Sequence, residues 1–140
     1  MICLDTNAVI ALLNSRNSRV ETGLQDALDR GIAVAMSPIV LFELWYGVAK
    51  SARPEHNAGR VRDFLAGPIR LLDFSAEDAE EAAEIRASLE RAGTPIGAYD
   101  VIIAAQARRR GALLVTANER EFTRVPGLKM ENWGSPKRAT

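Results

Sequence analysis

The sequence predicts an α/β fold in which a central five-stranded parallel sheet is covered by helices on both faces. Short apolar segments alternate along the chain with longer segments whose apolar residues recur at helical spacing. Strands that are apolar throughout are typical of parallel sheets buried on both faces. A chain of 140 residues has room for one domain with a core and is too short for two comfortable ones.

Five segments have the composition of buried strands, and a polar residue follows each of them. The first contains the single cysteine, Cys3, which has no partner for an intramolecular disulfide. We interpret Cys3 as a small core residue. The predicted strands are residues 2–4, 32–36, 69–74, 112–115 and 128–131.

Capping residues and glycines mark the predicted helices. Ser37 and Pro38 form a helix start, because serine caps the free N–H groups of the first turn and proline fits its first position. Ser75 opens a long acidic helix in the same way, and Gly31, Gly93 and Gly111 each follow a helix end. The predicted helices span residues 8–13, 20–28, 38–50, 61–66, 76–92 and 99–110.

Composition narrows the class of protein. With 47% hydrophobic and 26% charged residues, the chain is typical of soluble globular proteins. It has neither an apolar run of the roughly 18 residues that a membrane span needs nor a secretory signal. We therefore expect a cytoplasmic protein with no membrane partner. Residues 1–133 are expected to form the domain and residues 134–140 a flexible C-terminal tail.

The charged residues permit a nucleic-acid partner without indicating one. The formal net charge is zero, and most charged runs are expected to be solvated helix faces. The single histidine, His56, lies in the polar segment SARPEHNAGR and is expected at the surface. Because it has no plausible partner there, Ser/His/Asp and Cys/His catalysis are disfavoured.

Three acidic residues stand where the predicted fold brings chain segments together. Asp5 follows the first strand, Glu43 lies on the helix after the second, and Asp100 lies in the first turn of the helix before the fourth. Singly, each has an ordinary explanation as a helix cap, an exposed helix edge or a partner of the helix dipole. Together they can converge beyond the carboxyl ends of the strands, where open α/β sheets bind ligands. Carboxylates gathered there repel unless a cation shares them, and such ligands suit Mg²⁺ or Mn²⁺.

The segment LLVTANEREF after the fourth predicted strand offers further oxygen ligands. Asn118, Glu119 and Glu121 all lie in its polar turn, and the spacing does not choose among them. An ordinary turn with solvated acids would look the same. The candidates for orienting the acids or for contacting a substrate are Thr6, Asn7, Thr116 and Asn118.

Four stretches in order, LDTN, FELWYG, GTPIGAYDVIIAAQA and VTANEREFTRVPGLKMENW, resemble the signatures of PIN-domain ribonucleases. The resemblance is to the VapC toxins of type II toxin–antitoxin modules, and it extends from about Ile2 to Trp133. It implies a PIN-like three-layer α/β/α fold and a magnesium-dependent endoribonuclease, with Mn²⁺ as a substitute. It also implies a homodimer that is neutralised by a VapB-type antitoxin and that meets operator DNA only through the antitoxin.

By position, Asp5, Glu43 and Asp100 match the three acids that hold the metal in this family. Glu121 matches the fourth acid, whereas Asn118 stands where the family often has Asp, which leaves a second metal position open. Structured RNA is the expected substrate, with tRNA favoured.

Other functions fit the residues less well. A phosphohydrolase of the haloacid-dehalogenase type needs a second Asp where Asn7 stands, and no Walker-type loop is present. Asp73 matches the acceptor aspartate that a receiver-like signalling domain needs at the end of its third strand, but the match is isolated and leaves Glu43 and Asp100 without a role. A PIN-domain nuclease of RNA processing without antitoxin and a catalytically inactive binding module are the remaining alternatives, and retention of the three acids disfavours the second.

The surroundings of the acids suggest further contacts. Tyr46 and Tyr99 are candidates for stacking on a base. The candidate phosphate-binding residues are Arg53, Arg60, Arg62, Arg120 and Arg124. An amphipathic antitoxin helix is expected to bind at Leu12, Leu13, Trp45 and Val48.

Overall fold

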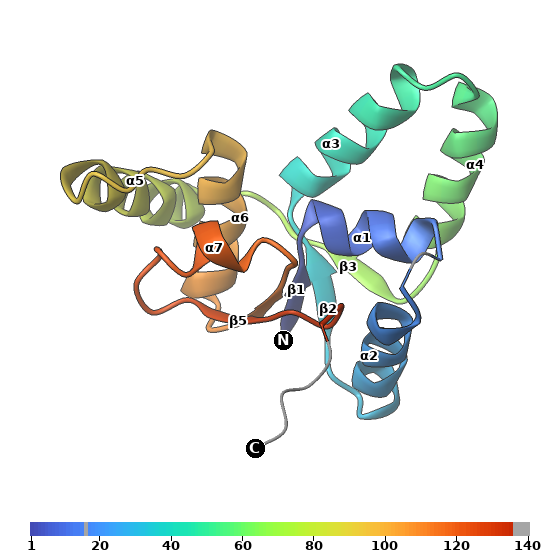
Figure 1. Ribbon diagram of the computed structural model, residues 1–140, viewed down its shortest axis with the longest axis horizontal. Helices are drawn as coiled ribbons and strands as arrows, with labels where there is room; N and C mark the ends of the chain where they lie inside the picture. Colours follow the sequence, from blue (N-terminus) through green and yellow to red (C-terminus); the bar gives the residue numbers. More distant parts are fainter. Residues whose placement is uncertain (16, 136–140) are drawn as a thin grey trace.

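The computed structural model describes residues 1–15 and 17–135, and it contains the predicted sheet (Figure 1). Five parallel strands lie in the order β3-β2-β1-β4-β5, so the first strand is the central one. The strands are β1 (Ile2–Leu4), β2 (Val34–Met36), β3 (Ile69–Leu71), β4 (Leu113–Val115) and β5 (Lys129–Glu131). Each lies within a segment predicted as a strand, and the predicted α/β fold with a five-stranded parallel sheet is confirmed.

Helices cover both faces of the sheet. Figure 1 shows α1 to α4 on one side and α5 to α7 on the other. Right-handed crossovers explain this division, because the chain steps outward from β1 to β3 and then returns across the sheet to β4. The helices are α1 (Thr6–Leu13), α2 (Ser18–Asp29), α3 (Pro38–Ala49), α4 (Pro54–Leu65), α5 (Ala76–Arg91), α6 (Ala98–Arg109) and α7 (Glu119–Phe122).

Two helices differ from the prediction. Helix α4 begins at Pro54 and not near Val61, because its first two turns are polar and bury little besides Ala58. Helix α7 was predicted as a polar turn. Its single turn is anchored by Phe122, which is fully buried, although most of its residues are charged.

The core lies around β1, whose three residues are all buried. Burial raises the pKa of the Cys3 thiol to about 11, as expected for a core cysteine. Near the chain's end, Trp133 packs against α2 at Gly23, where a Cβ atom would lie only 2.6 Å from the indole ring. The last described segment is thereby fixed to the body of the domain.

The predicted tail begins with Gly134, whose N–H donates to the side chain of Asn132 at 2.9 Å. Residues 136–140 lie outside the described residues. Among the helices that the structure describes, none is both long enough and apolar enough to cross a membrane.

Candidate functional site

The candidate site lies where the carboxyl ends of β1 and β4 meet. The chain leaves β1 into α1 on one face of the sheet and leaves β4 toward α7 on the other (Figure 1). Such a switch point opens a crevice in an α/β sheet. The Asp5 N–H donates to the Val115 carbonyl at 3.1 Å, which ties the two strand ends together.

Asp5 both caps a helix and faces the crevice. Its Oδ1 accepts a hydrogen bond from the Ala8 N–H at 2.8 Å, and its Oδ2 accepts one from the Thr116 hydroxyl. The Thr116 hydroxyl in turn accepts from the Asn118 N–H at 2.9 Å. Burial raises the pKa of Asp5, and the charge of Glu43 raises it further. The hydrogen bonds that its carboxylate accepts lower the pKa, but the net change is an increase. The cap explanation is thus correct and does not exclude a second role.

Glu43 is oriented by the residue that follows Asp5. The Thr6 hydroxyl donates to Glu43 Oε1 at 2.7 Å, which joins the first turn of α1 to the middle of α3. The side chain of Asn7 is exposed, although its backbone N–H contributes to lowering the pKa of Asp5. Of these neighbours, Thr6 has the direct side-chain contact with a predicted acid.

Asp100 and Glu121 complete the group of acids. Burial raises the pKa of Asp100 to about 7, and the hydrogen-bonded neighbour Glu121 and the charges of Glu43 and Asp5 add to the increase. Since electrostatic repulsion weakens with distance, these four carboxylates lie in one neighbourhood. We call Asp5, Glu43, Asp100 and Glu121 the acid cluster.

Asn118 and Glu119 occupy different places around this cluster. The Asn118 amide donates to Glu121 Oε2 at 3.3 Å. Asn118 therefore orients a neighbouring acid, at a position where the family often has an acid itself. Glu119 is exposed. Glu121 is therefore the acid of this turn that joins the cluster, while the roles of all these residues stay predictions.

The acid cluster fits a hydrated divalent cation. In the part of the chain that the structure describes, none of its members forms an ion pair with lysine or arginine. Among the described residues, no group of three or more His, Cys, Asp or Glu side chains is arranged so that it could hold a metal ion by itself. Mg²⁺ commonly binds through one or two carboxylates and keeps several of its waters, so an open set of oxygen ligands is suitable for it.

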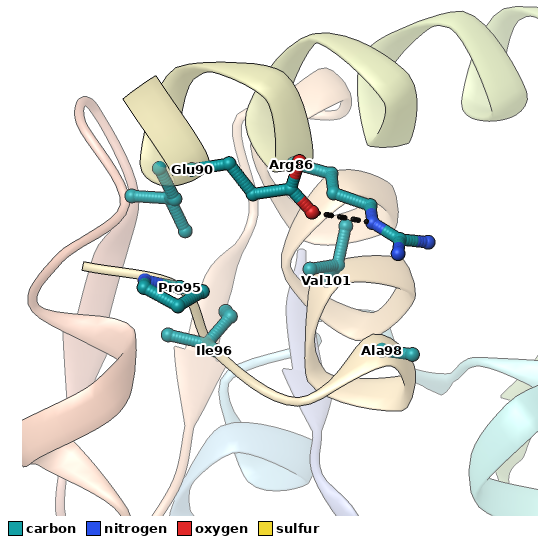
Figure 2. A pocket seen from close by; sticks show the side chains of 7 residues that line it. Arg86, Glu90, Pro95, Ile96, Ala98 and Val101 are labelled. Atoms are coloured by element: carbon teal, nitrogen blue, oxygen red, sulfur yellow. Dashed lines mark hydrogen bonds and ion pairs between the residues drawn. The ribbon is translucent and has the colours of Figure 1, made fainter. Parts of the chain in front are cut away.

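Two hollows lie on the surface of the described residues, and one of them reaches the acid cluster. The first is a groove of about 240 Å³ between α1, α3 and α4, lined by Ile10, Leu13, Glu43, Gly47, Val48 and Arg60 among others. The second, of about 230 Å³, lies between α5 and the start of α6 and is bordered by the Arg86–Glu90 ion pair (Figure 2). The groove includes a member of the acid cluster and the second hollow includes none.

One feature of the site was missed from the sequence. No role is predicted for Phe42 from the sequence, but 51% of its surface is exposed and its ring contacts Tyr99. Helical geometry carries a usable signal, because Val40, Leu44 and Val48 form the inward face and leave Phe42 off it.

Comparisons with known proteins agree with this architecture. The PIN domain family matches residues 2–128. The tRNA(fMet)-specific endonuclease VapC of Shigella flexneri is 40% identical over 130 residues, which cover 93% of this chain and 96% of that protein. The Ribonuclease VapC2 of Rickettsia felis is 39% identical over 130 residues with the same coverage.

Solved structures give the same result. VapBC2 from Rickettsia felis, bound to a DNA fragment from its promoter, matches with a TM-score of 0.88 and 38% identity, covering 95% of this chain and 99% of that one. VapBC-1 from nontypeable Haemophilus influenzae matches with a TM-score of 0.85 and 29% identity, covering 96% and 100%. PIN-domain nucleases generally depend on a divalent metal. The chain belongs to the PIN-domain family, in its VapC ribonuclease branch.

Proposed function

We propose that the chain is the toxin of a type II toxin–antitoxin module and cleaves tRNA in the cytoplasm by using Mg²⁺, or Mn²⁺ in its place, at the acid cluster. The observation that supports this most is a group of four carboxylates that has no basic partner among the described residues. Burial, and after it the charges of the neighbouring carboxylates, raise the pKa values of Asp5 and Asp100. Two relatives named as tRNA(fMet)-specific endonucleases support the substrate class.

The hydroxyl groups around the cluster keep its carboxylates in place for the ion. Thr116 and the Ala8 N–H fix both oxygens of Asp5, and Thr6 fixes one oxygen of Glu43. A bound divalent ion supplies a water of lowered pKa and polarises a phosphoryl oxygen. Without a cation, the pKa of Asp100 is about 7, so its carboxyl group is partly protonated at neutral pH and binding of the ion is expected to release that proton.

Basic residues must hold the RNA, because the acids repel its phosphates. Arg60 and Arg124 donate hydrogen bonds to main-chain carbonyl groups, and Arg62 lies over an indole ring. These contacts give the three residues roles inside the fold. Arg53 and Arg120 are exposed, and Arg120 lies beside Glu121, so we propose Arg120 as the first phosphate contact at the cluster.

The groove between α1, α3 and α4 is the proposed seat of a VapB-type antitoxin segment. Leu13 and Val48, two of the predicted contact residues, line it, and Glu43 joins it to the acid cluster. An apolar segment in this groove would therefore end next to the cluster. Related solved structures contain VapB with VapC, which supports a partner of this kind.

Two helix glycines allow a matched test of this groove. Gly47 lines the groove and Gly59 does not, yet a Cβ atom at either would meet nothing within 4 Å. Gly47→Leu is expected to weaken antitoxin binding at least about tenfold by filling the groove, whereas Gly59→Leu should leave binding unchanged. Isothermal titration with the antitoxin measures both. Equal affinities for the two variants would place the antitoxin elsewhere.

The activity itself is tested with the purified chain freed of any partner. We expect cleavage of tRNA in Mg²⁺, loss of cleavage in EDTA, and recovery on addition of Mg²⁺ or Mn²⁺. Cleavage that is insensitive to EDTA would contradict the metal-dependent mechanism. No cleavage of any RNA in the presence of Mg²⁺ would favour a binding module. An active chain whose gene has no antitoxin gene beside it would favour a nuclease of RNA processing.

A further inference from the structure

An aromatic pair joins the two helices that carry Glu43 and Asp100. Phe42 of α3 and Tyr99 of α6 meet edge to face, with ring centroids 5.7 Å apart and an interplanar angle of 75°. Each ring belongs to the residue directly before one of the acids. Although they contact each other, 51% of Phe42 and 46% of Tyr99 remain exposed. The pair therefore presents a large apolar surface at the edge of the acid cluster.

The other two aromatic residues of α3, Trp45 and Tyr46, differ from this pair. Lys50 lies over the ring of Tyr46 at 4.8 Å, and Arg62 lies over the ring of Trp45 at 5.6 Å. In both, a basic side chain covers a ring face. Within the described residues, no such cation–π contact involves Phe42 or Tyr99. Of the two residues predicted as candidates for stacking on a base, Tyr99 thus contacts Phe42, whereas the ring of Tyr46 is covered by Lys50.

The pair faces away from the proposed antitoxin groove. An α-helix turns by about 100° per residue, so Phe42 lies on the opposite side of α3 from Leu44, Gly47 and Val48, three residues that line the groove. An antitoxin segment in that groove would leave the aromatic pair open to a second molecule. The aromatic pair is continuous with the acid cluster, and RNA is the proposed substrate of that cluster. We therefore take RNA to be the molecule that binds the pair.

We propose that Phe42 and Tyr99 form a stacking platform for an unpaired nucleobase next to the scissile phosphate. This inference rests on the proposed ribonuclease function. Carboxylates and a cation hold a phosphate group but cannot distinguish a base, whereas exposed aromatic rings bind any base that has left a helical stack. The platform therefore selects single-stranded loops within structured RNA, and the base flanking the cut must be unpaired.

The test uses a hairpin RNA that carries the cut site mapped with the wild-type protein, with 2-aminopurine placed on either side of the cut. Binding is measured in the Asp5→Asn background, so that the RNA stays intact. We expect quenching of the fluorescence on binding, because a stacked 2-aminopurine is dark. Phe42→Leu and Tyr99→Leu should each weaken binding about 5- to 100-fold and abolish the quenching.

Tyr99→Phe keeps the ring and should retain both affinity and quenching. Tyr46→Leu removes another exposed aromatic residue from α3, the helix of Phe42, and should change neither affinity nor quenching. If Phe42→Leu fails to fold, as shown by its thermal unfolding, the contrast between Tyr99→Leu and Tyr99→Phe decides the question alone.

Two results would overturn the platform while leaving the proposed function intact. The first is wild-type cleavage with no change in 2-aminopurine fluorescence, or with leucine variants that bind as tightly as the parent. The second is conversion of a dimer to a monomer by Phe42→Leu or Tyr99→Leu in light scattering, which would make the pair a contact between two copies of the chain. A wild-type protein that cuts no RNA would instead contradict the proposed function.

Discussion

Two buried aspartates of this domain have opposite surroundings. Asp78, at the start of α5, is fully buried and forms ion pairs with Arg109 at 2.6 Å and Arg110 at 2.8 Å from the end of α6. Asp5 is 3% exposed, and the hydrogen bonds to its side chain come from a hydroxyl and backbone N–H groups, with no basic side chain among its described partners. The residue type and the burial are the same, and only the charge of the neighbours differs.

The consequence appears in the proton affinity of the two sites. Burial by itself would raise the pKa of Asp78, but hydrogen bonds from Arg110, Arg109 and Ser75 outweigh it and hold the pKa well below the usual range. At the acid cluster nothing comparable opposes burial, and the pKa of Asp100 rises to about 7. The fold satisfies the charge of Asp78 by itself, whereas it leaves the charge of the cluster for a ligand to satisfy.

The largest effect is expected at the acid cluster. Asp5→Asn should lower RNA cleavage at least about 100-fold, because the ion loses a charged ligand. The variant should unfold at the same temperature as the parent or slightly higher, since one of several repelling charges is gone and asparagine caps a helix as well as aspartate does. Cleavage assays in Mg²⁺ and thermal unfolding check the two halves of the prediction. Full activity in the variant would leave Asp5 with the role of a cap alone.

The same substitution at Asp78 should affect stability in the opposite direction. Asp78→Asn leaves Arg109 and Arg110 without their shared carboxylate and is expected to lower the free energy of unfolding by about 3 kcal/mol. Glu90→Gln, which breaks the exposed Arg86–Glu90 pair, is the control and should cost less than about 1 kcal/mol. Chemical denaturation measures both variants. A loss at Asp78 as small as that at Glu90 would contradict the distinction drawn between the two sites.

A smaller effect is expected from pH in the metal-free protein. The pKa of Asp100 is about 7 in the folded chain and about 3.9 when unfolded, so the folded state binds more protons between these values. The free energy of unfolding should therefore fall as pH rises from about 5 to 8. A tenfold change in proton affinity corresponds to about 1.4 kcal/mol, but Asp100 is partly exposed, and we expect only about 1 to 2 kcal/mol after solvent screening.

Denaturation at pH 5 and pH 8, with and without Mg²⁺, measures this effect. Saturating Mg²⁺ should remove most of the difference, and Asp100→Asn should remove it without metal. Asp78 contributes nothing in this range, because it stays ionised until the pH falls below its ordinary value. A free energy of unfolding that increased from pH 5 to 8 would be inconsistent with repulsion within the cluster.

The sheet and the approach of the acids were predictable because both depend on local patterns. Apolar runs identified the strands, and the position of Asp5 after the first strand placed it at the carboxyl edge of the sheet. The packing of side chains between elements was not predictable in this way. The Thr6–Glu43 hydrogen bond and the Phe42–Tyr99 contact join residues 37 and 57 positions apart in sequence, and no periodicity encodes such contacts.

Helix α7 shows a second reason for a missed element. Its four residues are too few to display a helical period, and three of them are charged, so the sequence looks like a turn. In the structure, backbone hydrogen bonds from Phe122 and Thr123 and the burial of Phe122 distinguish it from one. The choice of Glu121 over Glu119 depends on that helical turn, which is why the spacing alone left it open.

The hydrogen bond from Thr116 to Asp5 spans 111 residues of sequence, and Glu121 lies still further along the chain. During synthesis on the ribosome, Asp5 emerges among the first residues, and its companions emerge only when the chain is nearly complete. Because β4 pairs with the central strand and precedes Thr116 and Glu121, a nascent chain without β4 lacks both one side of the sheet and the complete group of carboxylates. Such a chain is not expected to cut RNA, so activity should begin only once β4 and α7 have folded.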